Sequence, residues 1–322
     1  MSFLEKPVVV VSKCLGFAHC RWNGLTIQAP AVEQLKKEVD FLTVCPEVEI
    51  GLGVPRDPIR IIRQNGNTML VQPATGRDFT QLMNDFVGSY LSGLEVVDGF
   101  ILKEKSPSCG TRRVKIYPGP GKVPVAAQGA GFFGGAVLEK FAHLPIEDEG
   151  RLNNFKIREH FLTRLFAAFR FRQLKHSPSS HGLVQFQARN KLLYMAYNQQ
   201  RMRAMGKIVA NPAKKPLPEV LAEYETNFYR VFAAMSRYTS NIDVLMHAFG
   251  YVSKRITKQE RVFFLDMLEK YRDERLPLSA LIGVMKAWII RFEVEYLQQQ
   301  TFFDPYPEGL MELGDSGKGR NL

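Results

Sequence analysis

Three cysteines follow apolar, strand-like segments in the first third of the sequence. Cys14 comes after VVVVSK, Cys45 after DFLTV and Cys109 after GFILKEKSPS. In an open α/β sheet the carboxyl ends of the strands meet at one crevice, where ligands bind. Three thiolates at that edge can hold an iron–sulfur cluster and leave one iron without a protein ligand. The spacing therefore predicts a metal centre with an open coordination position, where chemistry can take place.

The surroundings of these cysteines favour metal binding, and three alternatives stay open. Glycine or proline lies close to each cysteine, as expected of loops that bend around an inorganic group. Nearby cationic residues lower the pKa of a thiol and offset the charge of a thiolate-bound cluster. One alternative is zinc, which the lack of a C-x₂-C pair disfavours, and another is that the cysteines are small buried apolar residues. The third is that Cys20 is a fourth ligand, which would close the site.

Length and composition predict a soluble protein with more than one core. The 322 residues suffice for two domains of ordinary size. No apolar run of 18 residues is present, and the start MSFLEKPVVVV lacks the features of a secretory signal. Four cysteines without the spacing of a disulfide scaffold fit reduced thiols, so we expect a cytoplasmic protein with no membrane contact.

The positive charge is concentrated in the second half of the chain. The net charge is +11, and residues 143–322 contribute +8 of it, with 27 Lys and Arg against 19 Asp and Glu. We expect this half to present an anion-binding surface, for RNA or a nucleotide phosphate. The alternative is a solvated basic face that serves solubility.

Residues 1–144 alternate between strand and helix patterns. This alternation predicts a Rossmann-like α/β domain with a mostly parallel sheet and helices on both faces. The glycine-rich run at 129–135 lacks the spacing of a phosphate-binding loop, and we expect a tight turn with close packing there. Strands are predicted at 7–12, 41–44, 59–72 (a hairpin around Asn65-Gly66), 99–103 and 124–127, and helices at 32–38, 78–97 and 131–144.

The character of the sequence changes at the acidic stretch PIEDEG, residues 145–150, which we expect to be a linker. Strand patterns nearly vanish beyond it, so residues 151–301 are predicted to form an all-α domain, a helical bundle. The tail, residues 302–322, runs through proline and glycine and is expected to be disordered. Helices are predicted at 153–175, 183–205, 218–237, 242–249, 258–274 and 277–300.

The three cysteine segments resemble the thiouracil desulfidase (TudS-like) family. They read SKCLGFAHCRWNG, VCPEVEIGLGVPRDP and ILKEKSPSCG, and the similarity covers about residues 5–142. Residues 151–270 are similar to the YbgA-type helical domain, which occurs alone or fused behind a desulfidase-like domain. The chain is thus identified as a fusion of these two types.

The resemblance implies a cofactor and a set of site residues. It places a 4Fe-4S cluster on Cys14, Cys45 and Cys109 and leaves Cys20 outside the ligand set. It further implies that Glu47 of CPE and Ser106 of SPSC are catalytic. In that role Glu47 would act as general base or proton shuttle, and Ser106 would orient water or the heterocycle.

These observations lead to a functional hypothesis with two alternatives. The hypothesis is a 4Fe-4S-dependent, non-redox desulfidase that removes sulfur from thiolated uracil, its nucleoside or its nucleotide by hydrolytic C–S cleavage, releasing hydrosulfide. Its substrate is a small thiolated pyrimidine. One alternative is a non-catalytic iron–sulfur or zinc module that binds thiolated tRNA. The other is a thiolation enzyme, which the lack of a phosphate-binding loop for ATP disfavours.

Overall fold

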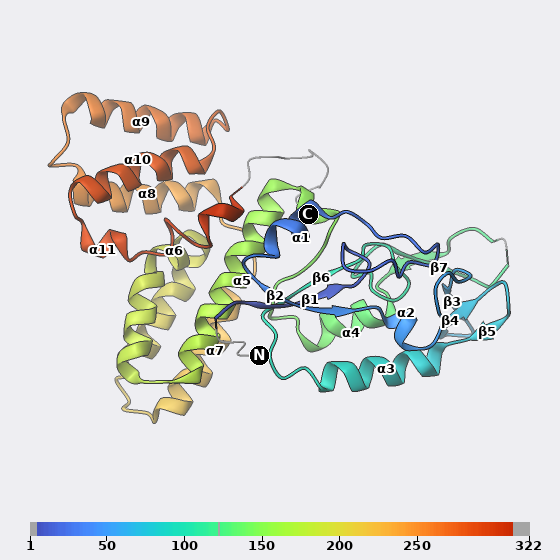
Figure 1. Cartoon of the computed structure of the whole chain (residues 1–322). Helices are drawn as coiled ribbons and strands as arrows, with labels where there is room; N and C mark the ends of the chain where they lie inside the picture. Colours follow the sequence, from blue (N-terminus) through green and yellow to red (C-terminus); the bar gives the residue numbers. More distant parts are fainter. Residues whose placement is uncertain (1–4, 122, 312–322) are drawn as a thin grey trace. The chain divides into compact units, whose positions relative to one another are not determined.

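The strands of the N-terminal part form two sheets (Figure 1). The structure, a computed structural model, describes residues 5–121 and 123–311. Sheet A is all parallel, in the order β2-β1-β6-β9, and sheet B is mixed, in the order β5-β4-β3-β7-β8. The strands are β1 (Val8–Ser12), β2 (Asp40–Val44), β3 (Arg60–Gln64), β4 (Asn67–Gln72), β5 (Arg77–Asp78), β6 (Gly99–Leu102), β7 (Val114–Tyr117), β8 (Ala127–Gly129) and β9 (Ile146–Asp148).

The valine run of β1 forms the centre of sheet A. Its four valines are completely buried, as expected of a parallel strand covered on both faces. Val10 pairs with Leu42 of β2 on one side and with Phe100 of β6 on the other. Because all three strands run in the same direction, the segments that follow them leave the sheet at the same edge.

Helices cover sheet A on two sides. In the view of Figure 1, α3 (Thr80–Ser92) and α4 (Phe132–Lys140) lie side by side below the sheet, and α1 (Pro30–Leu35) lies above it. A short helix, α2 (Pro46–Glu49), follows β2 directly. The predicted α/β domain with a parallel sheet is therefore confirmed.

Two of the differences from the sequence-based expectation concern the linker and the hairpin of this domain. Residues 145–150 are not a linker, because they include β9, whose Ile146 and Asp148 are buried where the strand pairs with β6. The hairpin around Asn65-Gly66 forms as predicted, but it belongs to sheet B rather than to the parallel sheet. The acidic composition of PIEDEG is atypical of a buried strand. Its carboxylates are accommodated because Asp148 and Glu149, at the end of β9, accept hydrogen bonds from backbone N–H groups.

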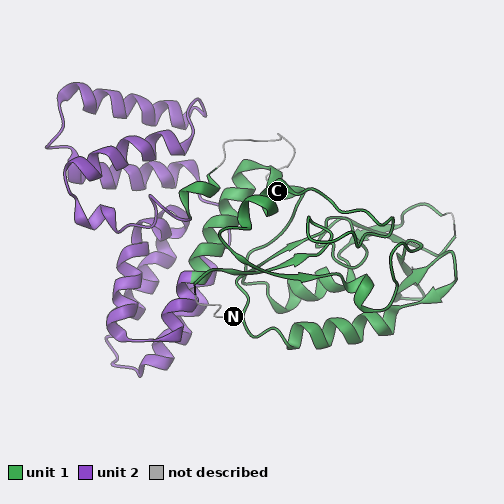
Figure 2. Ribbon diagram, viewed as in Figure 1, with its two compact units in different colours: residues 1–169, 307–322 green, residues 170–306 purple. Residues whose placement is uncertain are grey.

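The chain divides into two compact units inside one helix (Figure 2). Unit 1 comprises residues 1–169 and 307–322, and unit 2 comprises residues 170–306. The division falls within α5 (Phe155–His176), because the first part of this helix packs on sheet A. Its Leu165 side chain would lie 3.1 Å from a Cβ added at Gly99 of β6.

Unit 2 contains helices and loops but no strand among the residues described, in agreement with the predicted all-α character. Its core is aromatic, and Phe171 stacks on Phe228 with ring centroids 4.5 Å apart. Its further helices are α6 (Ser180–Ala210), α7 (Leu217–Val231), α8 (Tyr238–Val252), α9 (Lys258–Arg272), α10 (Leu278–Arg291) and α11 (Glu295–Gln298).

The segment after α11 is folded as far as the structure describes it. Phe302, Phe303 and Tyr306 are buried in unit 2, and Leu310 is buried in unit 1. The expected disorder is therefore wrong for residues 302–311, because four large apolar side chains anchor them. The rest of the predicted tail, residues 312–322, lies outside the described residues.

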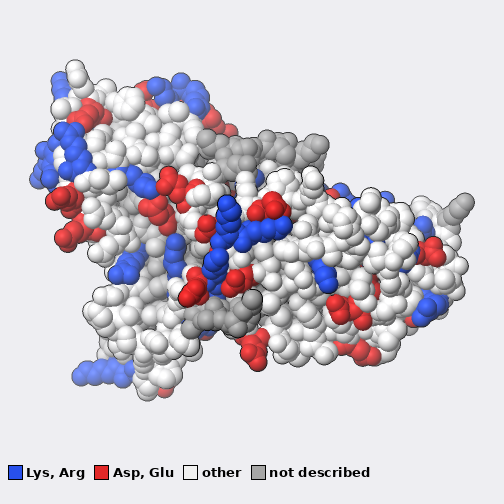
Figure 3. Space-filling model, in the orientation of Figure 1, with Lys and Arg blue, Asp and Glu red and all other residues white. Residues whose placement is uncertain are grey.

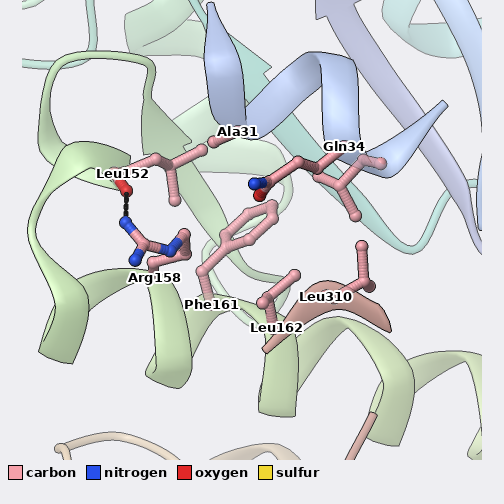
Figure 4. Close-up of a pocket in the computed structure, with 8 residues that line it drawn as sticks. Ala31, Gln34, Leu152, Arg158, Phe161, Leu162 and Leu310 are labelled. Atoms are coloured by element: carbon pink, nitrogen blue, oxygen red, sulfur yellow. Dashed lines mark hydrogen bonds between the residues drawn. The ribbon is translucent and has the colours of Figure 1, made fainter. Parts of the chain in front are cut away.

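A small void remains where α1 packs on α5 (Figure 4). Phe161 and Leu162 of α5 face Ala31 of α1 across it, and the Arg158 Nη1 group donates a 2.9 Å hydrogen bond to the Leu152 carbonyl beside it. The volume of about 10 Å³ holds at most one water molecule. This void is a feature of core packing and not a ligand site.

Candidate functional site

A cavity of about 360 Å³ opens at the carboxyl ends of the strands of sheet A. It is the place where the predicted site residues meet. Its lining includes all of the residues predicted to bind a cofactor or to act in catalysis, Cys14, Cys45, Cys109, Glu47 and Ser106, as well as Cys20.

The strand ends position the cysteines. Cys14 lies in the turn after β1, and the N–H of the preceding Lys13 donates a 2.8 Å hydrogen bond to the carbonyl of Val44, the last residue of β2. The segment that contains Cys45 therefore leaves the sheet beside the turn that contains Cys14. The next residue, Pro46, starts α2, a position that the fixed φ of proline favours.

The thiols influence one another across the cavity. Hydrogen bonding to Cys14 raises the pKa of Cys20, and hydrogen bonding to Cys20, together with burial, raises the pKa of Cys45. Burial raises the pKa of Cys109 to about 12. In the metal-free protein Cys20, Cys45 and Cys109 are therefore protonated at neutral pH. Metal binding would displace protons from those that act as ligands.

The donor set fits a polynuclear group better than a single ion. Within residues 5–121 and 123–311, no three His, Cys, Asp or Glu side chains converge on one point as a single metal ion requires. A cluster makes a different demand, because its thiolate ligands would bind different irons and need not converge on one point. All four thiols are free, and thiolate is the donor that iron–sulfur clusters take.

An ion pair that the sequence did not reveal fixes Glu47. The Arg56 guanidinium donates to Glu47 Oε2 from Nε at 2.9 Å and from Nη2 at 2.7 Å. Its Nη1 group donates to the carbonyls of Cys20 at 3.0 Å and Gly53 at 2.9 Å. The side chain of Arg56 is only 4% exposed, and this one buried group connects three segments of the cavity wall.

Two serines complete the surroundings of Glu47. Ser108 Oγ donates to Glu47 Oε1 at 2.7 Å, whereas Ser106 Oγ lies 3.4 Å from the same oxygen and 2.9 Å from Ser108 Oγ. The Cys109 N–H also donates to Ser106 Oγ at 3.1 Å. Ser106 thus lies near Glu47, but Ser108, which the sequence analysis did not single out, is closer. Both serines belong to the SPSC motif, which was the signal that could have identified Ser108.

The glycine-rich run at 129–135, which extends into the first turn of α4, supports the Cys109 loop. The N–H groups of Gly131 and Gly134 donate to the carbonyls of Gly110 at 2.7 Å and Ser108 at 3.0 Å. A Cβ at Gly134 would lie 2.4 Å from the Cys109 and Gly110 carbonyl oxygens, so only glycine allows this approach. The expected close packing is confirmed, and these amides serve the loop rather than a phosphate.

Comparisons with known families agree with this architecture. The pattern of the 2-thiouracil desulfurase family matches residues 9–149, and that of a family described as a protein of unknown function (DUF1722) matches residues 191–307. The α/β part with its thiol-lined cavity thus defines a desulfurase-type domain. The chain belongs to the 2-thiouracil desulfurase family through this N-terminal part, and a YbgA-like part follows.

Individual relatives match one part or the other. The uncharacterized protein YbbK of Bacillus subtilis (strain 168) is 33% identical over 111 residues, 32% of this chain and 74% of that protein. The uncharacterized protein YbgA of Escherichia coli (strain K12) is 26% identical over 158 residues, 48% of this chain and 93% of that protein. A solved structure named as the [4Fe-4S]-dependent thiouracil desulfidase TudS shares 29% identity and a TM-score of 0.35, over 46% of this chain and 93% of that one.

None of the helices in the described part of the chain has the length and apolar character needed to cross a membrane.

Proposed function

We propose that this protein is a 4Fe-4S-dependent desulfidase that acts in the cytoplasm on thiolated uracil, its nucleoside or its nucleotide. The main support for this proposal is that Cys14, Cys45 and Cys109 line one cavity with Glu47, in a domain of the 2-thiouracil desulfurase family. The overall reaction exchanges the ring sulfur for oxygen: the thiocarbonyl and water give a carbonyl, hydrosulfide and a proton, with no net redox change.

In this proposal Cys14, Cys45 and Cys109 hold the cluster. Cys20, the fourth thiol of the cavity, is not a ligand. When bound, the cluster would supply a Lewis-acidic iron with an open position for the sulfur of the substrate. The thiols present fit this group, because all are free and line the same cavity.

The protein's own contribution to catalysis is proton handling around Glu47. Arg56 stabilises the carboxylate through Oε2, so Glu47 can take a proton from the attacking water at Oε1. Ser108 already donates to Oε1, and Ser106 lies behind it, so the two hydroxyls form a short path for that proton. Ser106 retains its proposed role of orienting water or the heterocycle.

The test of this function is anaerobic reconstitution with iron and sulfide, followed by incubation with 4-thiouracil, 2-thiouracil and 4-thio-UMP. We expect one 4Fe-4S cluster per chain and equal amounts of hydrosulfide and desulfurated pyrimidine. Stoichiometric zinc with no cluster, or a cluster-loaded protein that releases no hydrosulfide from any of the three, would contradict the proposal.

A second proposal concerns an anionic part of the substrate. Residues 160–218 contain no Asp or Glu over 59 positions, but eleven Lys and Arg. Exposed cations of α6 such as Arg203 and Lys207 make this stretch suited to a phosphate or to RNA. On the face shown in Figure 3, by contrast, cationic and anionic side chains are mixed. The positive charge is therefore a property of this stretch rather than of that whole face.

This polyanion contact is tested by its salt dependence. Affinity for 4-thiouridine-containing tRNA should fall steeply as salt rises, and neutralising Arg203 and Lys207 together should flatten that slope. If the protein loaded with a cluster bound thiolated tRNA but desulfurated nothing, the non-catalytic RNA-binding alternative would be favoured. Salt-independent affinity would exclude the contact.

A further inference from the structure

Lys103 occupies a fixed place in the wall of the cavity. It follows β6 directly, and its N–H donates a 2.9 Å hydrogen bond to Ser12 Oγ at the end of β1. Its side chain is 19% exposed and lines the cavity. The ammonium group bonds to Glu149, which lies just after β9. Three adjacent strands of sheet A therefore determine where this charge lies.

The carboxylate that holds Lys103 is itself held. Glu149 is 9% exposed, and its Oε2 accepts a 2.9 Å hydrogen bond from the Glu104 N–H. One N–H of the ammonium points to Glu149 Oε1, whereas the nearest oxygen of Glu104 is 4.0 Å away, beyond hydrogen-bonding distance. An ammonium group has three donors. Two of them have no acceptor among the described residues and remain for a ligand in the cavity.

The other cations that line the cavity lack this combination. Arg56 uses its guanidinium on Glu47 and on two backbone carbonyls. Lys105 is 66% exposed and pairs with Glu104. No ion pair among the described residues holds Lys13 or Arg21. Lys103 thus combines a fixed position, partial desolvation and spare donors, which is the arrangement that makes a hydrogen bond from a charged group strong.

We propose that Lys103 binds the oxygen of the pyrimidine substrate, the carbonyl that is not replaced by sulfur. This inference rests on the proposed desulfidase function and adds a specificity residue to it. The ring carries a thiocarbonyl and a carbonyl at different carbons. A donor fixed on the carbonyl would hold the ring in one orientation and direct the thiocarbonyl towards the thiols. Glu149 is then a positioning residue that acts through Lys103.

The test is a comparison of two substrates in two proteins. 4-Thiouracil has the oxygen, and pyrimidine-4-thione lacks it. Lys103→Met keeps the length of the side chain and removes the charge. We expect kcat/KM for 4-thiouracil to fall about 10- to 100-fold, the range for a hydrogen bond to a charged group. For pyrimidine-4-thione it should stay within about twofold, so the preference of the wild type for the oxygenated ring disappears.

Two further variants keep the test specific. Lys115→Met, at an exposed position of β7 outside the cavity lining, should change neither substrate. Glu149→Gln can still accept from the Glu104 N–H, but it holds the ammonium less firmly, so it should lose activity selectively on 4-thiouracil and by less than Lys103→Met. Equal losses on both substrates in Lys103→Met would overturn the inference.

A binding measurement separates this inference from the proposed function. Calorimetric titration of the reconstituted protein with uracil and with pyrimidin-4-one needs no turnover. Lys103→Met should weaken uracil binding about tenfold or more and leave pyrimidin-4-one binding unchanged. If the wild type released no hydrosulfide, the desulfidase proposal would fail, and this titration would still decide the role of Lys103. Unchanged uracil binding would refute that role.

Discussion

The cavity of unit 1 and the core of unit 2 both contain buried polar side chains, but the two sets are arranged differently. In unit 2, Tyr224 donates to Gln187 Oε1 at 2.8 Å and Tyr194 lies 3.4 Å from Tyr224, all within packed helices. In unit 1, Glu47 and Ser108 have partners and also line open space. A polar set that is satisfied and enclosed serves to specify packing. Polar groups that are hydrogen-bonded to the protein and also line a cavity are positioned to bind a ligand.

The largest effects are expected from the thiols of the cavity. Replacing Cys14, Cys45 or Cys109 by Ala should abolish cluster binding, because each would remove the ligand of one iron. Cys20→Ala is the matched control in the same wall and should retain the cluster. Iron and sulfide analysis after anaerobic reconstitution measures both. If Cys20 proved as necessary as the other three, the site would be closed and the open-iron proposal would fail.

Removing the carboxylate of Glu47 should leave the cluster in place and impair the chemistry. Glu47→Gln keeps the shape of the side chain and should lower kcat about 10²-fold or more, the scale of general acid–base catalysis. Because Ser108 is the closer hydroxyl, Ser108→Ala should cost more than Ser106→Ala. Rates of hydrosulfide release, with the cluster spectrum as control, would show this order. Wild-type rates in Glu47→Gln would move proton handling to another group.

Support of the Cys109 loop by α4 should be visible in stability. Gly134→Ala places a Cβ 2.4 Å from two backbone carbonyl oxygens that cannot move aside. The cost should be about 3 kcal/mol, the upper part of the range for overpacking, with weakened cluster retention. Gly135→Ala, one position along the same helix, meets only the Ala130 side chain at 3.5 Å and should be neutral or stabilising. Equal melting temperatures for the two variants would contradict the assigned support.

The elements that local sequence patterns determine could be predicted, and the partners that the fold brings together could not. The valine run of β1 and the Asn65-Gly66 hairpin carry their own signals, and both are present. β7 was missed because four residues of short alternation give little signal alone, and β9 because its acidic letters resemble a linker. The boundary inside α5 has no signal at all, since the helix pattern continues across it.

Some features of the candidate site could likewise be predicted from the sequence, and others depend on the fold. The three cysteines follow strand-like segments and could be recognised from the sequence, whereas Glu47 and Ser106 were indicated only by the resemblance to the desulfidase family. The pairing of Arg56 with Glu47 and of Lys103 with Glu149 depends on loops and strands that meet only in the fold. The Lys103–Glu149 pair requires the pairing of β6 with β9, and the Arg56–Glu47 pair requires the path of the loop after α2. A single sequence supplies neither.

The smallest effect is expected from the enclosed polar side chains of unit 2, Tyr194, Tyr224 and Gln187. Tyr224→Phe removes the hydroxyl that donates to Gln187 and leaves the Gln187 Oε1 atom buried without that donor. Burial raises the pKa of Tyr224, so the hydroxyl is neutral at working pH and the loss is that of a neutral hydrogen bond. We expect the free energy of unfolding to fall by about 1 to 2 kcal/mol. Thr226→Ala, whose exposed hydroxyl donates only to the Ala222 carbonyl of its own helix α7, is the matched control and should be nearly neutral. Chemical denaturation measures both.

Hydrosulfide release from 4-thiouracil should be unchanged in the folded Tyr224→Phe protein, because an enclosed set of polar groups contributes to packing and has no open side for a ligand. A loss of turnover without a loss of stability would show instead that this set takes part in the reaction, and the distinction between the two regions would fail.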